Sequence, residues 1–434
     1  MAESLKDISI LWIIPFVGLL LSIAIMPLIN ENWWHHNFPK VSLLWGVPMA
    51  AAMFIILPGR TINTAVEFCS FIALIGSLYV ISSGIFLHGS FKSTPLTNCL
   101  FLAAGAVLAN MIGTAGASMV LVRPMLRINS KRKSKMHIFI FFIFIVSNIG
   151  GSLTPLGDPP LFLGFLQGVP FHWTLIHLFP GWAFSVGTLI LIFFVIDSVM
   201  LKKDGGVEPS AATEKFVLEG KINFLFLLGV LATVILYGNF LPNQWGHFRE
   251  AIQIALMCIF AVLSYRCTPN QVHMENKFSW FPIKEVAIIF AAIFACMIPA
   301  LNILEYKGST GQLAVTHSWQ FFWMSGGLSS FLDNAPTYLV FQSLGKTMGA
   351  VSNGVCHGVP VFQGCVPIKV LMAISMGAVF MGANTYIGNA PNFMVKSICK
   401  ENKVAMPSFF GYMAWSLLIL EPLFIAVTFI FFRT

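Results

Sequence analysis

Residues 148–160 read Asn-Ile-Gly-Gly-Ser-Leu-Thr-Pro-Leu-Gly-Asp-Pro-Pro, and residues 382–391 read Gly-Ala-Asn-Thr-Tyr-Ile-Gly-Asn-Ala-Pro. The two stretches align without a gap and place Asp158 on Asn389, which indicates an internal repeat. Each copy lies in a long apolar run, where Gly and Pro break a helix and leave backbone groups that lipid cannot satisfy. Two broken apolar helices at corresponding positions of two halves point to the binding site of a transporter.

Composition indicates that the chain lies in a membrane. Of its 434 residues, 57% are hydrophobic and 10% are charged, and the mean hydropathy is +0.82. These values predict an all-α polytopic membrane protein surrounded by the lipid bilayer. The net charge of +8 could suggest a nucleic-acid partner, but Lys and Arg lie in short gaps between apolar runs and form no extended basic face. We therefore expect no nucleic-acid binding.

Several motifs of soluble and membrane enzymes are missing from the sequence. There is no Walker motif, no dinucleotide fingerprint and no metalloprotease helix, so we expect neither enzymatic activity nor a cofactor. The eight cysteines show no zinc spacing, although Cys356 and Cys365 share one loop and could pair. The first apolar run, at 10–28, lacks a small-residue cleavage site and is interpreted as a retained spanning helix.

Apolar windows of about 20 residues, bounded by polar or Gly/Pro clusters, predict the same order of elements in two halves of the chain. Spanning helices are expected in the first half at 10–28, 41–57, 66–88 and 177–200, and in the second half at 222–241, 249–265, 281–303 and 409–431. Before its last helix, each half adds a pair of short apolar arms and then a broken helix, the broken helices being at 137–168 and 367–398.

The short arms, at 97–126 and 316–346, are predicted to form re-entrant hairpins, because each arm is shorter than the hydrocarbon layer. Their tips are expected at 110–114 and 333–337. The Asn and Thr that bound the first tip are spaced like the Asp and Thr that bound the second, so we expect these positions to correspond.

Each half then contains about five transmembrane helices, one re-entrant hairpin and one broken helix. We divide the chain into a first repeat at 1–201, a hydrophilic linker at 202–219 and a second repeat at 220–434. An odd number of spans makes the second half enter the bilayer from the opposite face, which predicts inverted repeats. Most of the 25 Lys and Arg residues then fall on one side. The positive-inside rule makes that side and the linker cytoplasmic and places both termini on the other side.

Two acidic residues lie within the motifs at membrane depth, Asp158 and Asp333, and Glu421 falls within the last helix. A carboxylate at that depth costs about 2.5–3.5 kcal/mol or more. With no Lys or Arg beside the motifs, Asp158 and Asp333 are candidates for neutralisation by a bound cation or by a proton, which is the chemistry of a cation/proton exchanger. The alternative is that these acids cap helices or accept structural hydrogen bonds.

The same motifs contain many Asn, Ser and Thr residues, whose side chains carry uncharged oxygen atoms. A small hard cation such as Na⁺ takes roughly five or six oxygen ligands, which unwound backbone and Asn, Ser and Thr side chains supply. The candidates are Asn110, Thr114, Asn148, Ser152, Thr154, Asn334, Thr337, Asn384, Thr385 and Asn389. Interhelical hydrogen bonding is the alternative for each of them. The glycines expected to permit the unwound backbone are Gly150, Gly151, Gly157, Gly382 and Gly388.

Three stretches resemble a known family. They are Gly-Thr-Ala-Gly-Ala-Ser-Met-Val-Leu-Val-Arg-Pro at 113–124, the break and its Leu-Phe-Leu-Gly-Phe continuation at 148–165, and Ser-Phe-Leu-Asp-Asn-Ala-Pro-Thr at 330–337. Together they are similar to the NhaD-type sodium/proton antiporters of the Ion Transporter superfamily and to the citrate-transporter-like group that shares this profile. The resemblance covers about 96–396.

The resemblance implies two inverted repeats, each with a re-entrant hairpin and a broken helix, assembled as a homodimer through a scaffold part while a transport part moves. It also implies a cation site where each hairpin tip meets the broken helix of its own half. One site would use Asn110, Thr114 and the break at 148–158. The other would use Asp333, Asn334, Thr337 and the break at 384–389.

We therefore predict a secondary active carrier of the cell inner membrane that exchanges Na⁺ (or Li⁺) for H⁺. Dicarboxylate carriers of the superfamily typically show Ser-Asn-Thr at their hairpin tips. Here the tips read Asn-Met-Ile-Gly-Thr and Asp-Asn-Ala-Pro-Thr, which disfavours an anionic substrate. Two alternatives stay open: a carrier that couples Na⁺ to citrate or dicarboxylate uptake, and a non-transporting membrane protein of carrier ancestry.

Overall fold

The computed structural model describes residues 8–88, 92–206, 217–239, 246–276, 278–310, 315–349, 351–352, 355–362 and 364–433. The helices of the first half are α1 (Ile14–Ile29), α2 (Glu31–Ile56), α3 (Pro58–Ser83), α4 (Pro95–Ile128), α5 (Met136–Ile145), α6 (Pro159–Leu166) and α7 (Phe171–Lys203). Those of the second half are α8 (Ile222–Asn239), α9 (His247–Cys267), α10 (Asn270–Glu275), α11 (Phe281–Ser309), α12 (Ser318–Ser329), α13 (Asn334–Lys346), α14 (Ile368–Met381), α15 (Ala390–Glu401) and α16 (Phe409–Phe431).

Short elements complete the fold. Single 3₁₀ turns are η1 (Ile10–Ile13), η2 (Ile149–Gly151) and η4 (Gly382–Asn384). The antiparallel strand pairs are β1 (Phe86–His88) with β2 (Val217–Glu219), β3 (Val351–Ser352) with β4 (Val355–Cys356), and β5 (Val359–Val361) with β6 (Gly364–Val366). Cys356 and Cys365 form a disulfide, as their shared loop allowed. Of the expected linker, residues 207–216 lie outside the described part of the chain.

The all-α polytopic fold is confirmed. In the described part of the chain, eight helices are long and apolar enough to cross a membrane by length and composition alone, namely α1, α2, α3, α4, α7, α9, α11 and α16, although α4 is bent back at Gly113. Shorter apolar helices occur at Met136–Gly151, Ile222–Tyr237 and Ile368–Asn384. The division into two inverted repeats at the boundaries given above stays a prediction.

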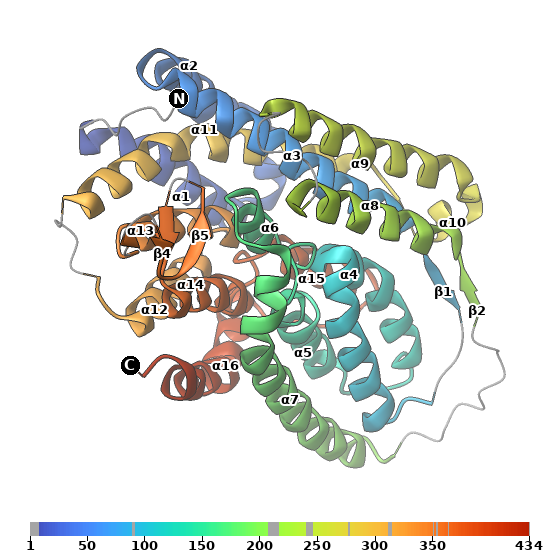
Figure 1. Cartoon of the computed structure of the whole chain (residues 1–434). Helices are drawn as coiled ribbons and strands as arrows, with labels where there is room; N and C mark the ends of the chain where they lie inside the picture. Colours follow the sequence, from blue (N-terminus) through green and yellow to red (C-terminus); the bar gives the residue numbers. More distant parts are fainter. Residues whose placement is uncertain are drawn as a thin grey trace.

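The helices form two layers that both halves of the chain share (Figure 1). One layer contains α1, α2 and α3 together with α8, α9 and α11, which pack on one another. The other contains α4, α5 and α7 together with α12, α13, α14 and α16, and α6 and α15 lie near its centre. Contacts of α3 with α4 and α6, and of α11 with α13, join the layers.

Several predicted helix boundaries are wrong, and the starts of two helices differ most. The helix expected at 41–57 begins at Glu31, because the side chain of Asn30 accepts a hydrogen bond from the backbone N–H of Trp33 and caps it. The helix expected at 66–88 is α3, which begins at Pro58, where a proline suits the first helical position. In both cases polar residues in the first turns conceal the true start.

The first hairpin folds back on itself at Gly113. This residue has φ 79° and ψ 156°, a conformation that L side chains rarely adopt. The side chains of Asn98 and Asn129, near opposite ends of α4, exchange hydrogen bonds of 3.1 and 2.9 Å. A straight helix of this length would separate its ends by about 50 Å, so the predicted hairpin and its tip are confirmed.

The second hairpin consists of α12 and α13, with the turn between Ser329 and Asn334. The rings of Phe321 and Phe341, one on each arm, have centroids 6.5 Å apart, so the arms run back alongside each other. The position of both hairpins relative to a bilayer stays a prediction.

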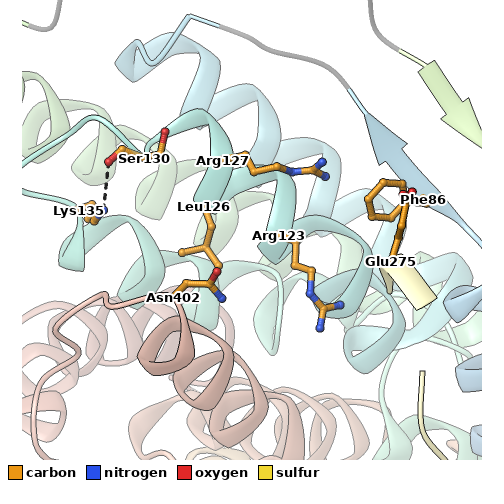
Figure 2. A pocket seen from close by; sticks show the side chains of 8 residues that line it. All are labelled: Phe86, Arg123, Leu126, Arg127, Ser130, Lys135, Glu275 and Asn402. Atoms are coloured by element: carbon orange, nitrogen blue, oxygen red, sulfur yellow. Dashed lines mark hydrogen bonds between the residues drawn. The ribbon is translucent and has the colours of Figure 1, made fainter. Parts of the chain in front are cut away.

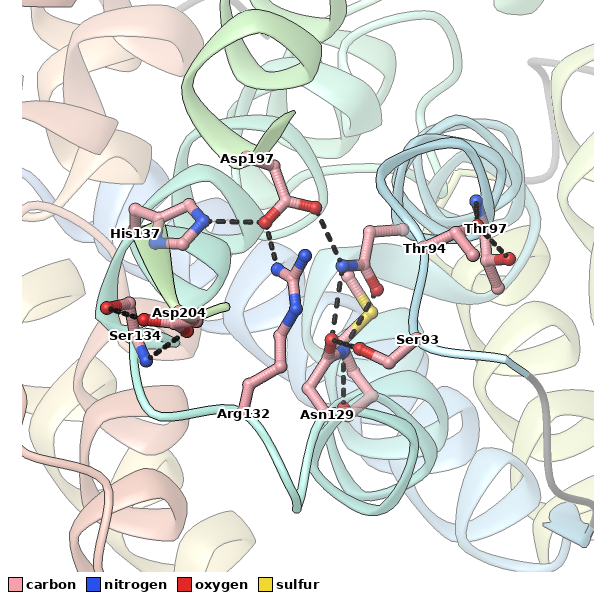
Figure 3. Close-up of polar contacts among 11 residues, drawn as sticks. Ser93, Thr94, Thr97, Asn129, Arg132, Ser134, His137, Asp197 and Asp204 are labelled. Atoms are coloured by element: carbon pink, nitrogen blue, oxygen red, sulfur yellow. Dashed lines mark hydrogen bonds and ion pairs between the residues drawn. The ribbon is translucent and has the colours of Figure 1, made fainter. Parts of the chain in front are cut away.

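A buried ion pair holds the base of the first hairpin against α7 (Figure 3). Asp197 accepts from the Arg132 guanidinium, from Nε2 of His137 at 2.7 Å and from Nδ2 of Asn98 at 3.0 Å. Asn98 in turn bonds Asn129. Arg132 is 3% exposed and Asp197 is fully buried, so each charge depends on the other for its compensation.

We expect Asp197→Asn to destabilise the protein by about 3–5 kcal/mol, because it leaves the buried Arg132 without a counter-charge. Thermal unfolding of the purified protein in detergent measures the loss. Asp204→Asn is the matched control, since Asp204 accepts hydrogen bonds of 2.8 Å from Ser134 outside this ion pair. Equal loss in both variants would contradict a special role for the ion pair. The double variant Arg132→Met/Asp197→Leu removes both charges and should recover part of the stability.

Candidate functional site

Both broken helices are confirmed, and they are interrupted in the same way. After α5 the chain forms the 3₁₀ turn η2 and resumes as α6, and after α14 it forms η4 and resumes as α15. Asp158 and Asn389 are the N-cap residues of α6 and α15, both with extended backbone, and each helix begins with a proline in its first turn. The repeat motif thus ends each interruption and begins a new helix.

The carboxylate of Asp158 is the centre of the candidate site. Its Oδ1 accepts from Oγ1 of Thr114 at 2.8 Å and from Nδ2 of Asn389 at 3.1 Å, and its Oδ2 accepts from Nδ2 of Asn334 at 2.5 Å. Asp158 is 1% exposed. The three donors come from the tip of the first hairpin, the tip of the second hairpin and the second broken helix.

Helix N-termini converge on this carboxylate. Asp158 and Asn389 occupy the N-cap positions of α6 and α15, Asn334 is the first residue of α13, and Thr114 begins the second arm of α4. The positive ends of helix dipoles favour negative charge there. The contacts found for Asp158 among the described residues include no Lys or Arg. Among these residues, the charge is met by neutral hydrogen-bond donors and helix N-termini.

A ring of asparagines joins the two broken helices. Asn148 donates to Oδ1 of Asn392 at 2.7 Å and accepts from Asn389 at 3.2 Å. Asn392 donates to the carbonyl oxygens of Gly382 and Thr385, both at 2.8 Å. The sequence analysis missed Asn392 because it aligns with an apolar residue, Leu161, in the first copy of the repeat. A polar residue one turn into a membrane-depth helix was the signal that could have revealed it.

In the first half, side chains satisfy the interrupted backbone. Nδ2 of Asn110 donates to the carbonyl oxygen of Gly150 at 2.7 Å, and its Oδ1 accepts from the N–H of Leu153 at 2.8 Å. Oγ1 of Thr154 donates to the carbonyl oxygen of Asn110 at 2.5 Å. Ser152 donates to the carbonyl oxygen of Ile149 at 2.9 Å. In this structure the three side chains act as hydrogen-bonding groups and do not contact Asp158.

The second half contains the same arrangement with other residues. Oγ of Ser330 donates to the carbonyl oxygen of Met381 at 3.1 Å, and Thr385 donates to the carbonyl oxygen of Ser330. Nδ2 of Asn384 donates to Ser330 and to Oε1 of Glu421, both at 3.0 Å. Glu421 thus contacts the second break.

These contacts correct the expected correspondence of the hairpin tips. Asn110 forms hydrogen bonds with Gly150 and Thr154 of the first break. Ser330 forms hydrogen bonds with Met381 and Thr385, which are the aligned positions of the second break. Asn110 therefore corresponds to Ser330. Thr114 then corresponds to Asn334, and both donate to Asp158. The pairing of Asn110 with Asp333 and of Thr114 with Thr337 is wrong. Equal spacing within each tip could not reveal which residue faces the break.

Asp333 has a different environment from Asp158. Its side chain accepts from the backbone N–H of Ala335 at 3.1 Å and caps α13, and Oγ1 of Thr337 donates to its carbonyl oxygen at 3.0 Å. The capping alternative therefore describes the contacts of Asp333. Since Asp158 draws two of its donors from the second half, its hydrogen bonds join the two halves. The two cation sites that the resemblance implied stay a prediction.

Two buried carbonyl oxygens of this region lack a hydrogen-bond partner within the described residues, Oδ1 of Asn334 and Oδ1 of Asn384. Buried polar atoms are nearly always paired. Asn334 uses its amide nitrogen on Asp158, so its free oxygen lies beside that carboxylate. An acidic oxygen next to an unpaired amide oxygen is a suitable start for a hard-cation site.

Glycines bring the backbone of each break close to itself. A Cβ added to Gly157 would lie 2.0 Å from the carbonyl oxygen of Gly151, and one added to Gly388 would lie 2.6 Å from that of Gly382. A Cβ on Gly150 would lie 2.7 Å from Cα of Ala106. These distances show that the glycines permit close packing of the backbone at each break.

We expect Gly157→Ala to reduce stability by about 1–3 kcal/mol through overpacking and to disturb the cluster around Asp158. Gly187→Ala is the control, because Gly187 lies in α7 and nothing lies within 4 Å of its added Cβ. The midpoint temperature of thermal unfolding of the purified protein in detergent should fall for the first variant alone. If the two variants behaved alike, close packing at the break would not be required.

Sequence reasoning also missed a polar network between the layers. Nε2 of Gln167 donates to Oε1 of Glu67 at 2.8 Å, and Nζ of Lys346 donates to Oε1 of Gln167 at 3.4 Å. Lys346 lies 3.8 Å from Oε1 of Glu305, which pairs with Arg60. Gln167 and Lys346 end α6 and α13, whereas the other three residues lie on α3 and α11. The network therefore connects the layer that contains both hairpins, called the hairpin layer below, to the layer of α1, α2, α3, α8, α9 and α11.

Comparison with known proteins identifies one family. A family model described as "Putative citrate transport" matches residues 5–432, which is nearly the whole chain. A comparison with curated proteins finds no match.

Proposed function

Because the chain belongs to the family described as "Putative citrate transport", it is a membrane transporter of the citrate-transporter-like type, and we propose that it is a secondary active carrier that exchanges Na⁺ (or Li⁺) for H⁺. The observation that supports this proposal is the buried carboxylate of Asp158, held by neutral donors from both halves. A buried carboxylate without a cationic partner is costly in a membrane unless an ion or a proton neutralises it.

Competition for one carboxylate would couple the two ions. When Asp158 binds Na⁺, its oxygens and Oδ1 of Asn334 coordinate the ion. When Asp158 is protonated, it carries no charge and Na⁺ loses its principal ligand. With Na⁺ or a proton bound, the site of Asp158 is neutral and can move between the two sides of the membrane. The empty site is charged, which disfavours its movement. Exchange follows, because the site can return across the membrane after it releases Na⁺ only when it has bound a proton, and the reverse.

Alternating access requires breakable contacts on both sides of the cluster. At one end, Nη1 of Arg123 on α4 donates to the carbonyl oxygen of Asn276 at 2.8 Å. At the other, Gln167 bonds Glu67. Both contacts connect the hairpin layer to the other layer, and we propose that they open in turn. The proposal includes an inner-membrane location, termini outside and a homodimer as predicted.

A second candidate function is Na⁺-coupled transport of citrate or a dicarboxylate. The description of the family favours it, and the helix N-termini that meet at Asp158 could hold a carboxylate group. Proteoliposomes with an imposed pH gradient and a lumenal pH dye distinguish the two functions. Dissipation by Na⁺ alone indicates exchange, and a response only to Na⁺ with citrate indicates carboxylate transport.

We expect Asp158→Asn to abolish Na⁺-dependent dissipation of the pH gradient, because the variant keeps the shape of the side chain and loses the group that binds both ions. Asp204→Asn, outside the cluster, is the control and should exchange normally. Normal exchange by folded Asp158→Asn would refute the assignment.

Asp333→Asn separates charge from capping. Asn caps a helix about as well as Asp, so the variant should stay as stable as the native protein. We propose that the charge of Asp333 also takes part in ion binding, and we therefore expect the variant to lose exchange. Exchange at the native rate would restrict Asp333 to capping α13 and leave Asp158 as the only acid of the site. Initial rates over a range of Na⁺ concentrations provide the measurement.

A further inference from the structure

The polar network between the layers lies at the far ends of two helices that begin at the candidate ion site. α6 has Asp158 at its N-cap position and Gln167 at its C-cap position. α13 begins with Asn334, which donates to Asp158, and ends at Lys346. The two helices pack on each other. A displacement of Gln167 and Lys346 therefore moves the helices whose other ends hold the carboxylate.

A disulfide-closed loop joins Gln167 to Lys346. The backbone N–H of Phe362, just after β5, donates to the carbonyl oxygen of Gln167 at 2.5 Å. A Cβ added to Gly364, the first residue of β6, would lie 3.4 Å from Cβ of Lys346, so β6 packs on that side chain. The disulfide described above links β4 to β6. Gln167, Lys346 and this loop therefore belong to one unit of the hairpin layer.

The partners of this unit belong to the other layer, and they are charged. Oε1 of Glu67 on α3 accepts from Gln167 at 2.8 Å, and Oε1 of Glu305 on α11 lies 3.8 Å from Nζ of Lys346. Glu305 also pairs with Arg60 of α3. The side chains of Arg60, Glu305 and Lys346 are only 20%, 16% and 12% exposed. Water therefore screens these charges only in part.

Lys346 balances the charge of the opposite wall. Glu67, Glu305 and Arg60 together carry a net negative charge when both acids are ionised. Glu67 and Glu305 attract the ammonium of Lys346, and Arg60 repels it. Glu250 of α9 acts on Glu67 as a further negative charge. Removal of Lys346 from the interface would leave this wall without the cation that comes from the hairpin layer.

The contacts of Lys346 are longer than those of its neighbours. Its Nζ lies 3.4 Å from Oε1 of Gln167 and 3.8 Å from Oε1 of Glu305. Charge-assisted hydrogen bonds are usually about 2.7–2.9 Å long, and Gln167 and Glu67 are joined at 2.8 Å. Lys346 is therefore held by attraction between charges, with little fixed geometry, and is suited to leave its partners and return.

The two ends of the interface between the layers differ. Near Arg123, a cavity of about 360 Å³ lies between α4 and the segments β1 and α10 (Figure 2). Arg123 and Arg127 line it from α4, and Phe86 and Glu275 line it from β1 and α10. At the end of Lys346, charged side chains of the two layers are in contact. The structure is therefore closed at the end of Lys346.

We propose that Lys346 is a tethered cation that closes this end of the ion pathway. Its ammonium faces Glu67 and Glu305, and it leaves with Gln167 and the disulfide-closed loop when the layers separate. The negatively charged wall is then open to an incoming Na⁺, which takes the place of the ammonium. The inference rests on the proposed function, because it requires layers that move and a cation that enters.

The distance between two spin labels, measured by double electron–electron resonance in nanodiscs, tests the closure. Ile62→Cys on α3 and Phe362→Cys in the loop carry the labels, since these side chains are 46% and 57% exposed. The free cysteines are replaced by Ser, and the disulfide is kept. Lys346→Gln should raise the ratio of long to short distances about tenfold, the effect of losing one contact to a charged group.

Three further variants make the test specific. Lys346→Arg keeps the charge and should stay closed. Lys307→Gln is the matched control, because it removes a charge from the same helix as Glu305, and the contacts of the network among the described residues do not include Lys307. Glu67→Gln should open this end, and its combination with Lys346→Gln should open it less than the two effects added, since both remove the same attraction. An unchanged distance in Lys346→Gln, or equal opening in Lys307→Gln, overturns the inference.

Sodium chloride tests whether Na⁺ replaces the ammonium. Compared with choline chloride, it should increase the long distances in the native protein and in Asp158→Asn, but not in Glu67→Gln. Equal distances in the two salts would overturn the replacement. Because the labels report distance and not ion flux, the two proposals can fail separately. Native exchange with no opening in Lys346→Gln refutes this inference alone, and opening without any Na⁺-dependent exchange refutes the proposed function.

Discussion

The structure depends on placing one carboxylate, that of Asp158, inside a membrane protein, where its hydrogen-bond partners among the described residues are all neutral. Such a group needs donors that water would otherwise supply. Thr114, Asn334 and Asn389 are these donors, and they come from three separate elements. A continuous helix cannot direct its first N–H groups and cap residues toward the middle of a bilayer, so the helices must stop and start again there.

Each interruption creates a second requirement, because it leaves backbone carbonyl and amide groups unpaired in an apolar region. Asn110 and Thr154 pair with these groups in the first half, and Ser330 and Thr385 do so in the second. The same need is met twice with different side chains. Close packing of Gly151 and Gly157 then brings the two ends of the break together.

Charged groups are placed where the two layers meet. The network that contains Glu67, Gln167 and Lys346 joins them at one end of α6 and α13, and Arg123 joins them through its hydrogen bond to the carbonyl oxygen of Asn276. Polar contacts of this kind carry less energy than an apolar core of the same area and exchange partners more readily. They are suitable boundaries for two layers that must move relative to each other. The apolar packing within each layer keeps it intact.

The sequence alone determined the membrane environment, the all-α class, the two breaks and both hairpins, because hydropathy and the effects of Gly and Pro on helices are local properties. It also identified Asp158, since a carboxylate at membrane depth is conspicuous in any apolar run. Only the tertiary structure decided that Thr114 corresponds to Asn334, that Asn392 joins the cluster and that Asp333 caps α13. Those facts depend on which residues face each other after folding, and the spacing of residues along one chain does not contain that information.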